Sequence, residues 1–114
     1  MNKSPNPHGL LAITALERVL MYAPDTYEEF ESSLLVQDAI AMRLQEAGEN
    51  LSKVRRNFPE FFTAHATQDW VELIGVRNII SHGYDGLDSH SIWLAIQEDV
   101  PRTLDGLRQV FHTE

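Results

Sequence analysis

The sequence of 114 residues contains no cysteine, which excludes both a disulfide framework and a thiolate metal site. This absence is typical of proteins that work in a reducing compartment. No apolar run approaches the ~20 residues that a membrane span needs, and residues 1–9 lack the apolar core of a signal peptide. We therefore expect a cytoplasmic protein with no membrane association.

The sequence also contains few basic residues. There are 9 Lys and Arg residues against 17 Asp and Glu, which gives a formal net charge of -8. Proteins that hold long nucleic acids by their phosphates usually have a basic face, so extended duplex binding is not expected. A catalyst needs only a local positive site, and any RNA footprint should therefore be small.

Histidine pairs at metal-binding spacing are also missing. His8, His65, His90 and His112 are scattered along the chain, with no i,i+4 pair and no HExxH motif. The sequence has no glycine-rich phosphate loop either, so it gives no support for ATP binding. We expect a protein that uses neither a metal nor a cofactor.

What the sequence does contain is typical of one folded domain spanning residues 1–114. Hydrophobic residues make up 43% and charged residues 23% of the chain, and the length allows a real core. Apolar residues recur every three or four positions, whereas the strict alternation of a strand is absent. This pattern predicts an all-α fold, an antiparallel bundle of four to five helices.

Proline residues divide the chain into its expected helices. Pro101 should kink or split the last helix, which Asp88 or Ser89 should cap. The boundaries are set by the apolar spacing and the breaks between the periodic segments. The four main helices are expected at about residues 10–20, 36–54, 68–81 and 88–111.

Several side chains have an expected place in this bundle. Phe61 and Phe62 follow the Asn-Phe-Pro break and should plug one end of the bundle. Met21 and Met42 are expected to lie in the core, because methionine is a flexible apolar residue that fills core gaps.

The expected helix at 68–81 is apolar on most sides, which predicts a central position in the bundle. The polar residues in and just after it therefore need an explanation. On a helical wheel of ~100° per residue they form two stripes, roughly 100–140° apart. The first stripe holds Gly75, Asn78 and His82, and the second holds Arg77, Ser81 and Tyr84.

Arg77 and His82 cannot converge if the helix stays regular through His82. The backbone could unwind near Gly83, the long arginine could reach around the helix, or two copies of the chain could combine their residues. We favour a dimer in which the histidines face a shared cleft. Gly75 has no side chain and would let another helix approach closely on the histidine stripe.

These residue types together suit phosphate chemistry. Arg77 offers a planar fork of donors that stays charged, and His82 can take and return protons near neutral pH. Asn78 could orient the histidine ring or a ribose, and Tyr84 adds a phenolic hydroxyl. Arginine and histidine without acidic metal ligands can cleave RNA through its own 2′-hydroxyl, with the arginine stabilising charge on phosphorus.

The segment from Arg77 to Tyr84 resembles the R-x4-H-x-Y signature of HepT toxins in the HEPN superfamily. The flanking sequence is similar as well, over roughly residues 36–111. The further matches are the lead-in of residues 70–76, the Gly48-Glu49 pair in the second long helix, and Trp93 with the Asp99-Val100-Pro101 segment.

The resemblance implies a metal-independent endoribonuclease that forms a homodimer. Arg77 and His82 would be catalytic at the subunit interface, with Asn78 and Ser81 in support. It also implies a toxin–antitoxin pair with an MntA-type nucleotidyltransferase antitoxin, which silences the toxin by adding AMP units to Tyr84. Phosphates added there would occupy the position of an RNA phosphate, from tRNA or mRNA, beside Arg77.

Other interpretations remain open at this stage. The chain could be a non-catalytic HEPN binding module that partners a nucleotidyltransferase and positions its substrate, or a plain helical interaction protein. In the last case Arg77 would pair with Asp38 or Glu49, and His82 would only serve the helix C-terminus. Tyr84 could likewise be an ordinary half-buried aromatic residue.

One basic run remains to be explained. Lys53, Arg55 and Arg56 stand close together near the end of the second long helix. They form either a solvated face that complements the helix dipole, or a minor contact for RNA or the antitoxin.

Overall fold

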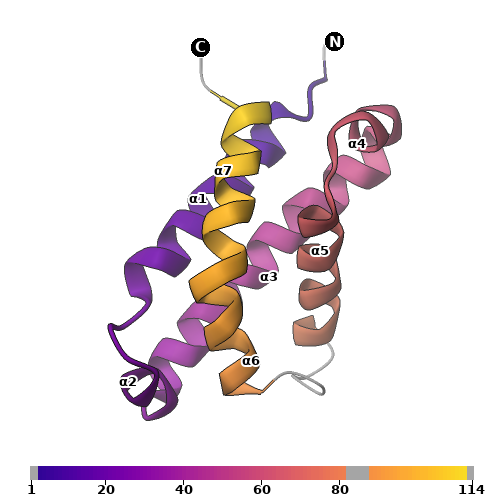
Figure 1. Cartoon of the computed structure of the whole chain (residues 1–114). Coiled ribbons are helices and arrows are strands. Elements are labelled where there is room, and N and C mark those ends of the chain that lie inside the picture. Colours follow the sequence, from indigo (N-terminus) through magenta and orange to yellow (C-terminus); the bar gives the residue numbers. More distant parts are fainter. Residues whose placement is uncertain (1–2, 82–87, 113–114) are drawn as a thin grey trace.

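The computed structural model describes residues 3–81 and 88–112, and within them the chain is helical with no strand. Figure 1 shows α1, α3, α5 and the α6–η1–α7 rod running alternately down and up, so the expected all-α antiparallel bundle is confirmed. The elements in chain order are α1 (Asn6–Tyr22), α2 (Tyr27–Glu31), α3 (Leu34–Asn57), α4 (Pro59–His65), α5 (Gln68–Ser81), α6 (Ser89–Leu94), the π-helical turn η1 (Ala95–Asp99) and α7 (Val100–Val110).

Local sequence signals set where the helices begin. At the start of α3, the Val36 N–H donates to Ser33 Oγ at 3.2 Å. At the start of α6, the Ser91 N–H donates to Asp88 Oδ1 at 2.7 Å, so Asp88 is the cap that the sequence predicted. Pro59 stands in the first turn of α4, where its missing N–H would have had no helical partner.

An aromatic cluster closes one end of the bundle, as the sequence predicted for Phe61 and Phe62. The Trp70 ring lies 5.7 Å from Phe62 and stacks on Phe111 at 5.6 Å, and Phe61 lies 5.6 Å from Phe111. Trp70 and Phe111 are almost fully buried. These contacts join α4, α5 and the end of α7 around one apolar plug.

The last helix is one rod with a widened turn. η1 lies directly before Pro101, which stands in the first turn of α7. Proline has no N–H to donate to the preceding turn and its ring crowds that turn, so a single π turn absorbs the mismatch. The sequence predicted a kink or a split of the helix at Pro101, and the structure has a π-helical turn directly before it.

The two methionines expected in the core are on the surface. Met21 is 76% exposed and Met42 is 52% exposed, so that prediction was wrong. Met42 lies seven residues from both Leu35 and Glu49, and this spacing places all three on the outward stripe of α3. Methionine at helical spacing thus does not reveal which side of the helix is buried.

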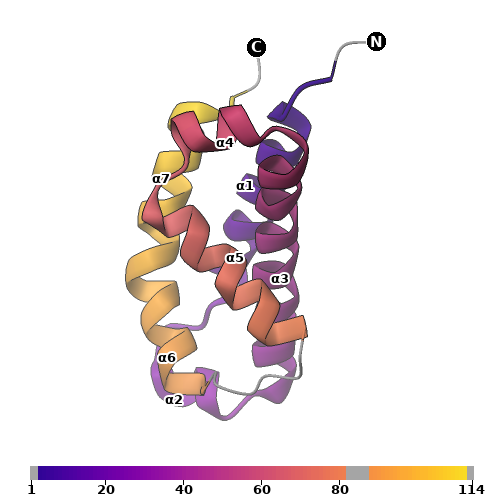
Figure 2. The ribbon, with the colours of Figure 1, turned by 90° about the vertical axis from the view of Figure 1, so that its right-hand side faces the viewer.

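The expected central position of α5 was also wrong. Figure 2 shows α5 crossing α3 obliquely at one side of the bundle, and it packs mainly on α3. Some of its apolar residues, such as Trp70 and Ile74, are buried, whereas Val71 remains 42% exposed. A groove of about 250 Å³ separates α5 from the α6–η1–α7 rod, with Leu16 and Leu44 among its lining residues.

Among the described residues, no helix is both long enough and apolar enough to cross a membrane.

Candidate active site

Helices α3 and α5 cross in close contact at Gly48 and Arg77. A Cβ added to Gly48 would overlap the Cβ of Arg77 and would lie 2.7 Å from the Leu73 carbonyl oxygen. Only a residue without a side chain lets the two helices meet at this distance. Gly48 therefore sets the place of Arg77 directly over α3.

Arg77 is held at this crossing by two acceptors. Its Nη2 lies 2.6 Å from Glu49 Oε2, and its Nη1 donates to Asn78 Oδ1 at 2.9 Å. The side chains of Arg77 and Glu49 are each 31% exposed. Each Nη atom carries a second N–H, so a bound phosphate can still accept from a guanidinium that is already oriented.

The arginine Nε is buried and has no hydrogen-bond partner among the described residues. A guanidinium carries five donors, and an unpaired buried donor costs free energy. Glu49 and Asn78 therefore accept from the two Nη atoms, and the other N–H groups of the guanidinium have no partner among the described residues. This is the arrangement of an arginine that is fixed in direction yet keeps donors for a ligand.

The structure also tests the two-stripe reading of α5. Arg77 and Asn78, which the wheel placed on different stripes, are joined because the long arginine side chain reaches to its neighbour. Ser81 is exposed and is the last residue of α5. His82, Gly83 and Tyr84 lie outside the described residues.

Gly75 was expected to admit another helix. Beyond its own helix, no atom of the described residues lies within 4 Å of the place where its Cβ would stand. No helix among residues 3–81 and 88–112 fills this position. The expectation therefore concerns a second copy alone and stays a prediction.

Glu49 is the residue whose role sequence reasoning understated. It was named as an ion-pair partner for Arg77 and as part of the Gly48-Glu49 pair, but not as a site residue. The available signal was a glycine beside a carboxylate in the middle of a long helix, where glycine costs about 0.5–1 kcal/mol relative to alanine. Such a glycine needs a packing reason, and the neighbouring α5 supplies it.

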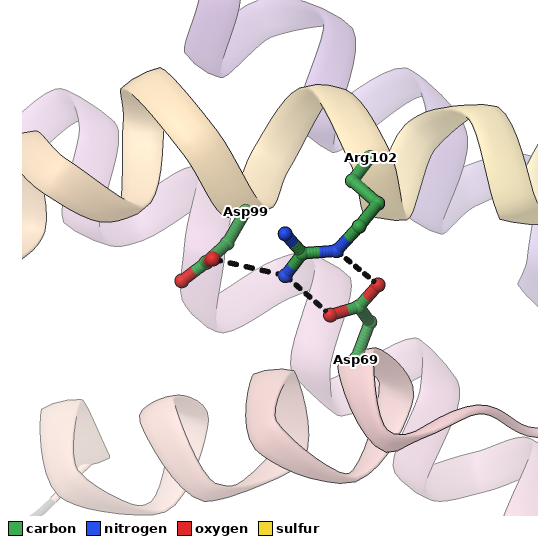
Figure 3. Close-up of polar contacts among 3 residues, drawn as sticks. All are labelled: Asp69, Asp99 and Arg102. Carbon is green, nitrogen blue, oxygen red and sulfur yellow. Dashed lines mark hydrogen bonds and ion pairs between the residues drawn. The ribbon is translucent and has the colours of Figure 1, made fainter.

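On another flank of α5, an ion triad fixes the first turn of the helix. Arg102 donates from Nε and Nη2 to the two carboxylate oxygens of Asp69, at 2.9 and 2.8 Å, and from Nη2 to Asp99 Oδ1 at 3.0 Å (Figure 3). The hydrogen bonds to Asp69, and then those to Asp99, raise the pKa of Arg102 above its ordinary value. The triad thus links α5 to the end of η1 and the start of α7.

The groove beside this triad is separate from the Arg77 contacts. Its α5 wall consists of Asp69, Glu72, Leu73 and Val76, centred about a quarter turn round the helix from Arg77. Among the described residues, no three His, Asp or Glu side chains are grouped closely enough to bind a metal ion. The chemistry of the described site therefore centres on one anchored arginine.

Comparison with known proteins shows the family of this chain. The sequence profile of the family described as "HepT-like: Ribonuclease HepT-like" matches residues 12–110, which include α5, its Arg77 and the Glu49 partner. The chain belongs to the HepT-like ribonuclease family.

Individual relatives carry ribonuclease names. A protein of Methanocaldococcus jannaschii named "Putative RNase MJ1380" is 33% identical over 76 residues, which cover 67% of each chain. A protein of Thermococcus cleftensis named "Probable ribonuclease HepT" is 29% identical over 76 residues, 66% of each chain. A third, "Putative RNase TTE0752" of Caldanaerobacter subterraneus, is 24% identical over 89 residues, covering 78% of this chain and 77% of its own. No solved structure matches this HepT-like chain.

Proposed function

We propose that the protein is a metal-independent RNA endonuclease in which Arg77 and His82 act together. The observation that carries this proposal is the guanidinium of Arg77 on α5, which Gly48 and Glu49 of α3 hold in place. Preorganised donors aimed at a developing charge are usually the largest single contribution to catalysis. The ribonuclease names of the relatives support the same substrate class.

The proposed chemistry needs only side chains. Arg77 binds the scissile phosphate through its remaining N–H groups and stabilises charge on phosphorus. His82 deprotonates the ribose 2′-hydroxyl or protonates the leaving 5′-oxygen, because histidine is the side chain that can take and return protons near neutral pH. Asn78 keeps the arginine oriented, and Ser81 adds a hydroxyl one residue before the histidine.

We also infer that the active form is a homodimer that packs through the outward stripe of α3. Leu35 and Met42 on this stripe are 81% and 52% exposed, and Leu34 beside them is 74% exposed. Exposed apolar groups gathered at one place indicate an interaction surface. The stripe continues to Glu49. A second copy seated on it would therefore stand next to the Arg77 contacts, and the two copies would enclose a shared cleft.

The biological role that we propose is that of a toxin. The partner is an MntA-type nucleotidyltransferase, which silences the nuclease by adding AMP to Tyr84. Added phosphates would compete with the RNA phosphate for Arg77, so one modification would block the site electrostatically and sterically. The runner-up is a HEPN module that binds the nucleotidyltransferase without cutting RNA, for which His82 would be dispensable.

The decisive experiment is a gel assay of the purified protein on tRNA and mRNA in the presence of EDTA. We expect cleavage by the wild type and none by His82→Ala, whose helical fold should be unchanged by circular dichroism. Arg77→Lys keeps the charge but loses the fork, and it should also be strongly impaired. Equal cleavage by His82→Ala would remove the catalytic assignment of His82, whereas no cleavage by the wild type would favour the binding module.

A second assay tests the regulatory site separately. Tyr84→Phe should keep nuclease activity and should gain no mass after incubation with MntA and ATP. A mass increase on this variant would show that the acceptor lies elsewhere, whereas cleavage by it would still support Arg77 and His82.

A further inference from the structure

The outward stripe of α3 changes character as it passes the Arg77 contacts. Beyond Glu49 it continues to Lys53 and Arg56, which lie within about 60° of one another and of Glu49 round the helix. Lys53 is partly buried and Arg56 is exposed. With a rise of ~1.5 Å per residue, they lie about 6 Å and about 10 Å along the axis from Glu49.

The two cations are left unpaired by the same contact that anchors Arg77. A glutamate four residues before a lysine is the favoured geometry for a helical ion pair, so Glu49 would ordinarily pair with Lys53. In this chain Glu49 instead bonds Arg77. Within residues 3–81 and 88–112, neither Lys53 nor Arg56 lies within ion-pair distance of a carboxylate.

Arg55, the third residue of the basic run, is used differently. Its guanidinium carbon lies 5.8 Å from the centre of the Phe62 ring, so it stacks on the aromatic end of the bundle. The run therefore divides into one structural arginine and two free cations. This division makes Arg55 a control that has the same charge and stands in the same stretch of α3, but on another side of the helix.

We propose that Lys53 and Arg56 form a second phosphate site, which binds the RNA backbone on one side of the scissile linkage. This inference rests on the proposed ribonuclease function and deepens it. A strand whose scissile phosphate lies at Arg77 would extend along the end of α3 and place its following phosphates beside Lys53 and then Arg56. The ligand is single-stranded RNA, because a short line of cations on an acidic protein cannot neutralise a long duplex.

The chain's charge makes this route selective. With a net charge of -8, most of the surface repels RNA, so the paired guanidinium and two unpaired cations on one edge define where a strand can lie. The short RNA segment that the composition predicts would therefore run from the middle of α3 toward α4.

The test compares two substrates and two charge losses. Wild type, Lys53→Gln/Arg56→Gln and Arg55→Gln are assayed on a single-stranded 12-nucleotide RNA and on a dinucleotide that has the same scissile linkage. The dinucleotide is too short to reach the second site. We expect the ratio of kcat/KM on the long RNA to kcat/KM on the dinucleotide to fall about tenfold in the double variant and to stay constant in Arg55→Gln.

Binding is measured independently of cleavage, by fluorescence anisotropy with a 12-nucleotide RNA that carries a 2′-O-methyl group at the scissile position. The slope of log affinity against log salt should decrease by about 1.4 in the double variant, since each phosphate contact to a single strand contributes ≈ 0.7. Arg55→Gln should leave this slope as it is in the wild type.

The outcomes separate this site from the catalytic proposal. If the wild type binds RNA with the predicted slope change but cuts neither substrate, the second site stands and the nuclease proposal fails. If the wild type cuts both and the double variant shows the wild-type ratio and slope, the second site is refuted. If the double variant and Arg55→Gln lose equally in the kcat/KM ratio and the salt slope, the basic run serves only the helix terminus. If the double variant loses only antitoxin binding, the run is a protein contact.

Discussion

Gly48 and Arg77 touch across the α3–α5 crossing so closely that even a methyl group on Gly48 would overlap the arginine side chain. Gly48→Ala should therefore push α5 off α3 and displace Arg77. We expect a loss of about 1–3 kcal/mol in the free energy of unfolding, as for other overpacked contacts. Nuclease activity should fall by more than the loss of folded protein alone would cause. Chemical denaturation and the RNA gel assay measure the two effects.

Gly75→Ala is the matched control for that experiment. Gly75 lies on α5, the helix that carries Arg77, but the site of its Cβ is open among the described residues. Alanine there should stabilise α5 by about 0.5–1 kcal/mol through helix propensity. A destabilised Gly75→Ala monomer would show that the Gly48 result reflects helix composition and not the crossing.

Glu49 should act as a positioning residue for Arg77. In Glu49→Gln the neutral amide accepts a weaker hydrogen bond and leaves the guanidinium less fixed. We expect kcat to fall by about tenfold to a hundredfold, while KM stays level or decreases because a negative charge beside the phosphate has gone. Glu46→Gln, on the same helix in a surface pair with Arg43, is the control. A rise in KM with unchanged kcat would contradict the positioning role.

The outward stripe of α3 should control the oligomeric state. Leu35→Glu with Met42→Glu places two charges on residues that are 81% and 52% exposed, so the folded monomer should be affected little. We expect this variant to elute as a monomer and to lose nuclease activity in parallel. Light scattering coupled to size exclusion gives the mass. Leu94→Glu, 44% exposed on α6, is the control, and a double variant that stays dimeric would place the interface elsewhere.

Asp88 should make stability depend on pH. The Ser91 backbone N–H and then the Ser91 hydroxyl, both bonded to the carboxylate, hold the pKa of Asp88 below its ordinary value. A lowered pKa stabilises the fold at pH values above the unfolded-state pKa, and this contribution is lost as the pH falls through the folded value. Asp88→Asn should therefore melt lower than the wild type at pH 7.

The same difference should narrow below about pH 4, where the wild-type carboxyl begins to take up its proton. Asp88→Ala, which also loses the cap itself, should remain less stable at every pH. Thermal unfolding between pH 2 and pH 7 measures all three proteins. A wild-type advantage over Asp88→Asn that persists unchanged at pH 2 would contradict this assignment.

Much of the fold was predictable because its signals are local. The break before Pro59 and the cap at Asp88 are set by backbone chemistry within a few residues, and α5 begins at the residue that its apolar period predicted. The exposed position of Met42 and the place of α5 at the side of the bundle were not predictable in this way. Both depend on how helices from distant parts of the chain pack together, which a single helix's pattern does not encode.

The candidate site shows the same division. The sequence selected Arg77 by its chemistry and its family signature, and it named Glu49 as one of two carboxylates that could pair with it. The choice of Glu49 over Asp38 follows from the crossing point of α3 and α5, which Gly48 permits. The roles of His82 and Tyr84 stay predictions.

Both ends of the chain emerge beside α4 and the end of α7, whereas α5 finishes and α6 starts at the opposite pole of the bundle (Figures 1 and 2). The molecule measures 47 Å along its longest axis, so an affinity tag or a fluorescent label on either terminus is well removed from Ser81. Immobilising the protein by a terminal tag therefore leaves the Ser81 end of α5 accessible to a modifying enzyme, whereas an RNA strand that follows Lys53 and Arg56 would run toward the tag. Labelling near Asp88 would instead obstruct the Ser81 end.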